Sequence, residues 1–220
     1  MKTIVVFGDS LTWGYKPENE LLPLGSPVSR FGDDERWPGV LEAALGDGFR
    51  VIPEGLNGRT TVWEDPTEPC RRGLDQLIPV LETRAPFDMV ILMLGTNDVK
   101  GYFSASARDI ARGMARLVST TLTYCANNFT GKPLVLLVSP PHIGEDVDNS
   151  ISELAHMGAL AKSKELAGLY QAVAEQYGVG FFDAATVATA SAIDQVHLDV
   201  DQHASLGHGI APVVRGMLAG

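Results

Sequence analysis

Cysteine is scarce in this 220-residue chain: Cys70 and Cys125 are the only two, and neither belongs to a CxxC pair. A chain of this length buries a substantial core without covalent cross-links. We therefore expect two free thiols and a reducing, cytoplasmic compartment. A disulfide between Cys70 and Cys125 is the alternative.

Basic residues are fewer than acidic ones. Lysine and arginine total 17 against 27 aspartates and glutamates, so the formal net charge is -10 at pH 7. Binding to a phosphate backbone needs a basic face. We therefore expect no nucleic-acid partner.

Long apolar runs are absent as well. No stretch approaches the length that spans a membrane, and the short apolar run at the N-terminus lacks the cleavage site of a signal peptide. We expect no membrane partner and no secretory leader. Internal repeats, low-complexity tracts and linkers are also missing, which predicts one domain over residues 1–220.

What the chain does contain is a regular alternation of strand and helix patterns. The opening run to Gly8 is apolar and β-branched, and the run from Phe87 to Leu94 is almost continuously apolar, as in a buried parallel strand. Five alternations with long crossovers predict an α/β fold, a parallel sheet between two helical layers. Further strands are expected over 49–52, 134–138 and 179–182, a long loop over 15–36, and helices over 37–45, 73–83, 104–127, 151–177 and 204–218.

Polar, glycine-containing loops follow the first three predicted strands. They are Gly8-Asp9-Ser10, Asn57-Gly58 and Gly95-Thr96-Asn97-Asp98. Ligands of open α/β sheets bind at the carboxyl ends of the strands, so these loops are expected to meet. Asp-Ser after a strand is also ordinary turn and capping chemistry, which is the alternative for this pair alone.

A histidine three residues after an aspartate completes a set of groups for acyl transfer. Ser10 can attack a carbonyl if His197 accepts its proton, and Asp194 is placed to hold the imidazole and stabilise its charged form. The developing oxyanion needs fixed donors. The candidates are the backbone N–H groups of Ser10 and Gly58 and the side-chain amide of Asn97.

With these motifs the chain resembles the SGNH hydrolases, also called GDSL esterases. The resemblance lies in four blocks, in family order, over nearly the whole length: Gly8-Asp9-Ser10-Leu11, Asn57-Gly58, Gly95-Thr96-Asn97-Asp98 and Asp194-Gln195-Val196-His197. The longer stretches 7–14, 55–61 and 93–98 look like the bacterial arylesterase and acyltransferase branch, which includes perhydrolase-like enzymes.

This resemblance implies a three-layer α/β/α, flavodoxin-like fold with a five-stranded parallel sheet. It also implies hydrolysis of short-chain, acetyl-type esters of aryl, alkyl or sugar alcohols through an acyl-enzyme, with acyl transfer as a further activity. No metal and no cofactor are implied. The expected partners are a small-molecule ester and further copies of the chain in a homo-oligomer.

Three further residues are candidates for the substrate pocket. Trp13 lines the acyl pocket or belongs to the core. Arg59 faces the pocket or braces a loop. His142, on the loop that follows the fourth strand, is a candidate wall of the site.

Two other classes of function remain open from the sequence. Asp199, Asp201, His203 and His208 suggest a metal-dependent phosphoesterase, although their spacing matches no standard metal pattern. A non-catalytic, flavodoxin-like binding module is the second alternative, but it has no need for all four blocks.

Overall fold

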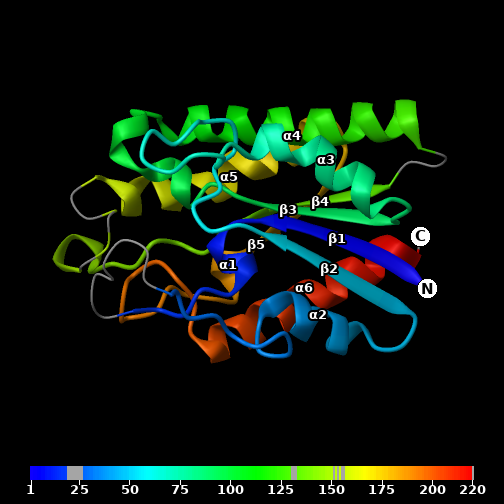
Figure 1. Ribbon diagram of the computed structural model, residues 1–220, viewed down its shortest axis with the longest axis horizontal. Coiled ribbons are helices and arrows are strands. Elements are labelled where there is room, and N and C mark those ends of the chain that lie inside the picture. Colours follow the sequence, from blue (N-terminus) through cyan, green and yellow to red (C-terminus); the bar gives the residue numbers. More distant parts are fainter. Residues whose placement is uncertain (19–26, 130–132, 151, 153, 155–156, 220) are drawn as a thin grey trace.

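A five-stranded parallel sheet organises the chain in the computed structural model, which describes residues 1–18, 27–129, 133–150, 152, 154 and 157–219. The strands lie in the order β2-β1-β3-β4-β5, with helices on both faces (Figure 1). This confirms the predicted fold class. The strand bounds are β1 (Lys2–Gly8), β2 (Phe49–Gly55), β3 (Met89–Met93), β4 (Leu134–Ser139) and β5 (Gly180–Asp183).

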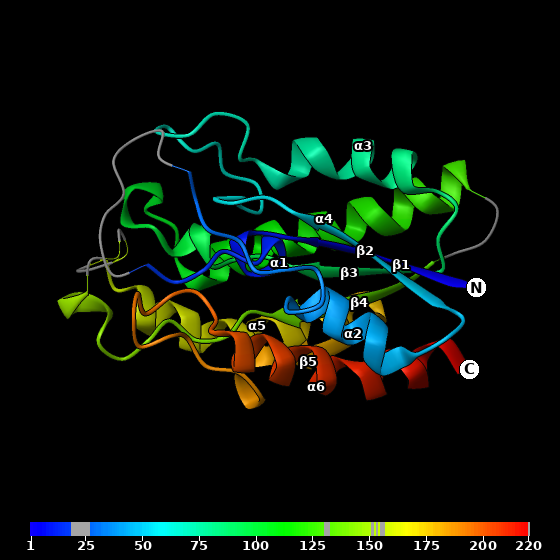
Figure 2. The same ribbon diagram turned by 60° about the horizontal axis from the view of Figure 1, so that its bottom comes forward.

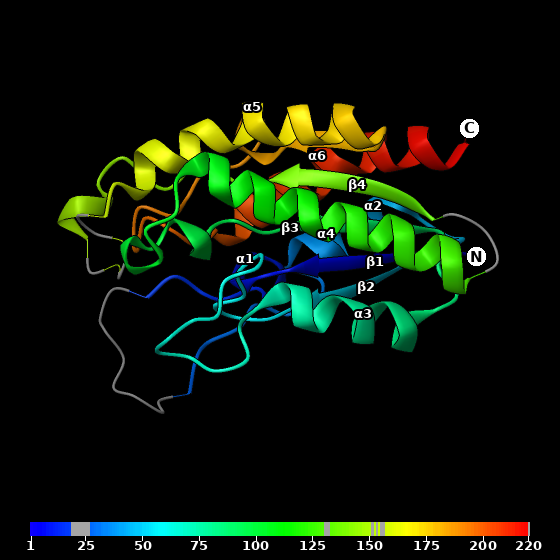
Figure 3. The ribbon, with the colours of Figure 1, turned by 90° about the horizontal axis from the view of Figure 1, so that it is seen from above.

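Two helical layers cover the sheet. One layer is α2 (Trp37–Leu45) and α6 (Val200–Ala219), and the other is α3 (Gly73–Arg84), α4 (Ala107–Asn128) and α5 (Ala159–Tyr177) (Figure 3). A short helix, α1 (Ser10–Trp13), follows β1. No helix in the described part of the chain is both long and apolar enough to cross a bilayer.

The central strand β3 shows why the sheet is buried on both faces. Met89, Ile91 and Met93 pack with α2 and α6, whereas Val90 and Leu92 pack with α3, α4 and α5. Alternate side chains of a strand point to opposite faces. A strand covered on both sides is therefore apolar throughout, and this is the pattern that made it recognisable in the sequence.

Several element boundaries differ from the expected ones; α4, for example, begins at Ala107 and α6 at Val200. β2 continues past Ile52 through Pro53 to Gly55, because it lies at the edge of the sheet, where a proline is tolerated. The helix expected from residue 151 begins at Ala159, after a left-handed Gly158. Residues 151, 153, 155 and 156 of that expected helix, and residues 19–26 of the expected loop, lie outside the described part.

The strand order brings the polar loops together. β1 pairs with β2 on one side and β3 on the other, in a register that aligns Gly8 with Gly55 and with Met93. The segments after these three strands therefore lie at one end of the sheet, opposite the two chain termini (Figure 2). The order of connection also reverses between β1 and β3, which is where open α/β sheets bind ligands.

Helices α2 and α6 are linked through a buried histidine. His203 on α6 is fully buried, and its Nδ1 accepts the backbone N–H of Trp37 on α2 at 3.4 Å. Burial, with a smaller effect of charge at His197 and Arg36, lowers the pKa of His203 from 6.5 to about 4. As the pH falls through this range, the unfolded chain takes up a proton that the folded chain does not, so the unfolding free energy decreases.

Replacing His203 with asparagine is expected to reduce this acid sensitivity. The stability lost between pH 7 and pH 5, measured by urea denaturation, should be smaller in the variant by about 2 kcal/mol. Burial raises the pKa of Asp9 and of Asp98 to about 6, so these two carboxyl groups increase the unfolding free energy as the pH falls. Wild type and His203→Asn both contain them, so their effect cancels in the comparison. His208→Asn, at an exposed position of α6, is the control. The same pH dependence in wild type and His203→Asn would contradict the assignment.

Candidate active site

Ser10 lies where β1 turns into α1. Asp9 is the N-cap of this helix, and its Oδ1 accepts the backbone N–H of Leu11 at 3.0 Å. A Cβ at Gly8 would lie 2.1 Å from Thr12 Oγ1, so the turn needs glycine there. The turn therefore presents the Ser10 hydroxyl at the carboxyl end of β1.

His197 and Asp194 belong to one tight turn before α6. Asp194 Oδ1 accepts the backbone N–H groups of Val196 and His197 at 3.0 and 2.9 Å, which leaves Oδ2 to bind the imidazole. Gln195 between them has a left-handed backbone with φ 65°. The same carboxylate therefore shapes the turn and orients the ring.

The structure brings these three side chains into one hydrogen-bonded chain. Asp194 Oδ2 lies 2.7 Å from His197 Nδ1, and His197 Nε2 lies 3.0 Å from Ser10 Oγ. Because the carboxylate accepts the Nδ1 proton, Nε2 is free to accept the serine proton. Burial raises the pKa of Asp194, but hydrogen bonds from His197 and the turn backbone outweigh it, so the pKa lies below the usual value.

The oxyanion candidates Gly58 and Asn97 lie on loops that are held together. Gly58 has φ 74°, and a Cβ there would lie 2.9 Å from Glu68 Oε2. Asn97 Nδ2 donates to the backbone oxygen of Arg59 at 3.1 Å, which uses one of its two N–H groups. Next to it, the buried Asp98 accepts the backbone N–H of Thr61 at 2.9 Å. These bonds fix the loops after β2 and β3 against each other.

The Arg59 guanidinium braces the backbone below these loops. It donates to the backbone oxygen of Gly8 at 2.6 Å and to that of Glu54, lies 4.1 Å above the Phe7 ring, and binds Gln76 Oε1 at 2.8 Å. Arg59 is 5% exposed. This arrangement matches the bracing alternative for Arg59, and it ties the β1 turn to the β2 loop.

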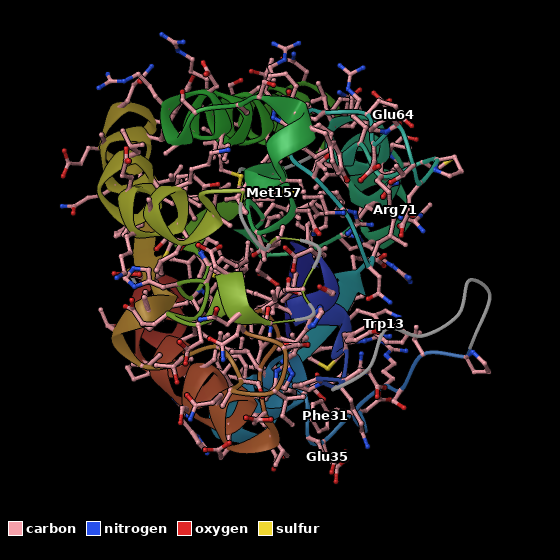
Figure 4. All side chains as sticks on the ribbon, turned by 90° about the vertical axis from the view of Figure 1, so that its left-hand side faces the viewer. Trp13, Phe31, Glu35, Glu64, Arg71 and Met157 are labelled. Atoms are coloured by element: carbon pink, nitrogen blue, oxygen red, sulfur yellow. The ribbon has the colours of Figure 1, made fainter. Side chains whose placement is uncertain are left out.

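Trp13 and His142 occupy different parts of the same end of the sheet. Trp13, labelled in Figure 4, is half-buried. The Arg30 guanidinium lies 4.6 Å above its ring. His142 follows β4 and is also half-buried. The described part of the chain shows no hydrogen bond or ring contact from His142 to Ser10 or His197.

The acidic and histidine residues of the tail do not converge. His203 is buried against α2, and Asp199 accepts the Ser191 hydroxyl at 3.0 Å. Among the described residues, no group of three or more His, Cys, Asp or Glu side chains is arranged to hold a metal ion. The acidic and histidine side chains that suggested a phosphoesterase therefore make separate local contacts.

Two residues at the site were not singled out from the sequence. Tyr15 stacks on the His197 ring, with the centroids 4.3 Å apart and the planes at 24°. The Gln195 side chain ties the Asp194–His197 turn to the loop after β4, because its Oε1 accepts the backbone N–H of Asp146 at 3.0 Å. Tyr15 starts a loop without periodicity, and a left-handed glutamine has no sequence signature, so neither residue could be found from spacing.

Comparison with known proteins gives consistent matches. The model of the GDSL-like lipase/acylhydrolase family matches residues 6–208. A carbohydrate acetylesterase from Sinorhizobium meliloti is 39% identical, with a TM-score of 0.88 over 99% of this chain and 100% of that chain. The aryl esterase of M. smegmatis is 41% identical, with a TM-score of 0.88 over 98% of this chain and 99% of that one.

A more distant match is similar in fold. A member of the lipolytic protein G-D-S-L family from Veillonella parvula is 16% identical, with a TM-score of 0.68 over 98% of this chain and 99% of that chain. The comparison with curated proteins gives no significant match.

Proposed function

This chain belongs to the GDSL-like lipase/acylhydrolase family and is a carboxylic ester hydrolase, and we propose that it cleaves short-chain, acetyl-type esters through an acyl-enzyme on Ser10. The observation that carries the proposal is the hydrogen-bonded chain from Asp194 through His197 to Ser10. Nucleophile, base and orienting carboxylate within hydrogen-bond reach are the signature of a serine hydrolase.

In the proposed mechanism Ser10 Oγ attacks the ester carbonyl while its proton passes to His197 Nε2. Asp194 stabilises the imidazolium that forms. The backbone N–H groups of Ser10 and Gly58 and the second amide N–H of Asn97 are the donors for the oxyanion. His197 then protonates the leaving alcohol, and a water molecule deprotonated by the same nitrogen releases the acid from Ser10.

The substrate class rests on the relatives. One similar structure is a carbohydrate acetylesterase and another an aryl esterase, which supports small acyl groups on sugar or aryl alcohols. We also propose that alcohols compete with water for the acyl-enzyme, because the Trp13 ring limits the access of water. Its centroid lies 6.4 Å from that of Tyr15, which stacks on His197. The test is hydrolysis of p-nitrophenyl acetate and its longer-chain homologues, with added alcohol. A preference for long chains would contradict the acetyl proposal, and hydrolysis alone at high alcohol concentration would contradict acyl transfer.

We further propose a cytoplasmic location and a homo-oligomeric assembly. The two cysteines are free, which supports a reducing, cytoplasmic compartment. A homo-oligomer rests on the family resemblance, and a small-molecule ester remains the expected partner. Light scattering at micromolar concentration that shows a monomer would remove the oligomer proposal.

Replacing Asn97 with alanine is expected to lower kcat for p-nitrophenyl acetate by about 10²–10³-fold, because one preorganised donor to the oxyanion is lost. The measurement is steady-state kinetics beside thermal unfolding. Asn149→Ala, at an exposed position after β4, is the matched control and should keep the wild-type rate. A kcat for Asn97→Ala within twofold of the wild type would remove Asn97 from the donors.

A further inference from the structure

The faces of the His197 ring are less restrained by hydrogen bonds than its edge. The bonds to Asp194 and Ser10 lie in the plane of the ring, at Nδ1 and Nε2. Tyr15 covers one face, with centroids 4.3 Å apart and planes at 24°. The phenol ring therefore limits tilting of the imidazole out of the plane of its two hydrogen bonds.

The backbone fixes Tyr15 to the nucleophile's own turn. Its N–H donates to the carbonyl oxygen of Ser10 at 3.1 Å, directly after the left-handed Gly14 that ends α1. On its other side Tyr15 pairs with Arg30 in an antiparallel bridge. A Cβ at Gly14 would lie 2.2 Å from Arg36 Cδ, so this path of the chain needs glycine.

The stack therefore joins two segments that are far apart in sequence. His197 is carried by the turn before α6, whereas Tyr15 moves with Ser10. Because the Tyr15 backbone is bonded to Ser10 and its ring lies on the face of His197, Tyr15 fixes the position of the imidazole relative to the serine. Small errors in such positioning cost large factors in rate.

The stack also bears on the charge that develops during catalysis. His197 becomes an imidazolium when it takes the serine proton, and the face of an aromatic ring attracts a cation. Asp194 is the carboxylate in direct contact with the imidazole, and Asp9 and His203 act on it from farther away. An attraction that exists only when the imidazole is charged lowers the barrier rather than the substrate affinity.

We propose that Tyr15 is a positioning residue for His197, which holds the imidazole between Asp194 and Ser10 and stabilises its charged form through the face of the ring. The proposal rests on the proposed function of Ser10 and His197. It assigns Tyr15 a role in the rate of acyl transfer, not in substrate binding.

The test compares Tyr15→Leu with two variants that keep an aromatic ring, Tyr15→Phe and Tyr15→Trp. Tyr15→Leu is expected to lower kcat for p-nitrophenyl acetate by roughly 3–30-fold with KM within about twofold of the wild type. At least one of the two aromatic variants should restore kcat to within about threefold of the wild type, because the ring face is the feature that acts. Thermal unfolding identifies any variant that has lost its fold.

A second readout does not depend on ester turnover. Labelling of Ser10 by a fluorophosphonate probe, followed by intact-protein mass, needs the Ser10–His197 pair and should slow in Tyr15→Leu by a similar factor. Tyr177→Leu is the control, because Tyr177 is the last residue of α5, and this helix ends on the side of the two chain termini, away from α1 (Figure 3). It removes an aromatic ring without touching the site.

The outcomes separate this proposal from the proposed function. A folded Tyr15→Leu with wild-type kcat and labelling rate overturns the role of Tyr15 alone. A change confined to KM, or a loss of kcat that neither aromatic variant restores, also overturns it. If Ser10→Ala hydrolyses the ester as fast as the wild type, the proposed function fails, and the role of Tyr15 fails with it.

Discussion

Replacing Ser10 with alanine is expected to lower kcat for p-nitrophenyl acetate by roughly 10⁴-fold or more, because no atom remains to form the acyl-enzyme. The fold should not change. Among the described residues the Ser10 hydroxyl bonds only to His197, and the cap of α1 is made by Asp9. The measurement is initial rate at saturating ester, with circular dichroism to verify the fold.

Two controls accompany this variant. One removes a different serine hydroxyl, and the other tests the metal-dependent alternative. Ser205→Ala removes an exposed hydroxyl on α6 that donates to the Asp201 carbonyl, and should keep full activity. The wild type should be equally active with and without chelator. Equal rates for Ser10→Ala and wild type would mean that another residue is the nucleophile. Activity lost on chelation and restored by metal would favour the metal-dependent alternative.

Replacing Asp194 with asparagine is expected to lower kcat by about 10³–10⁴-fold while the turn persists. The amide oxygen can still accept the backbone N–H groups of Val196 and His197, as Oδ1 does now. The amide nitrogen, in the place of Oδ2, donates a hydrogen bond to Nδ1. The imidazole must then carry its proton on Nε2, where it cannot accept the proton of Ser10.

The matched control for Asp194 lies in the same segment. Asp201→Asn removes an exposed carboxylate at the start of α6 that bonds only Gln202 among the described residues. It should keep the wild-type kcat. The measurements are steady-state kinetics and thermal unfolding of both variants. A kcat of Asp194→Asn within tenfold of the wild type would show that another group orients His197.

The order of the elements was predictable because local patterns follow from burial. β3 is apolar throughout since both its faces are covered. Helix α2 was predicted with its observed bounds, Trp37–Leu45, because Pro38 suits a first turn and Gly46 ends the helix. The fold class predicted from these patterns and the family implied by the sequence motifs are confirmed. The interpretation as one domain and the roles of the site residues stay predictions.

Two of the errors in the predicted boundaries have physical causes that a local sequence pattern does not contain. Pro53 marks the end of a strand by local rules, yet β2 continues because an edge position leaves its missing N–H without consequence. The start of α5 depends on a left-handed glycine, which the chain supplies at Gly158. Position in the sheet and the backbone angles of single residues are not visible in hydrophobic periodicity.

The sequence by itself determined the fold class, the family and which residue types were present for acyl transfer. Those properties depend on local patterns and on motifs whose chemistry is complete within a few residues. Only the tertiary structure decided that Nε2 of His197 lies 3.0 Å from Ser10 Oγ, that Arg59 braces the backbone, and that Tyr15 covers the imidazole. These contacts join segments far apart in the chain, so they exist only once the parallel sheet has brought the ends of its strands together.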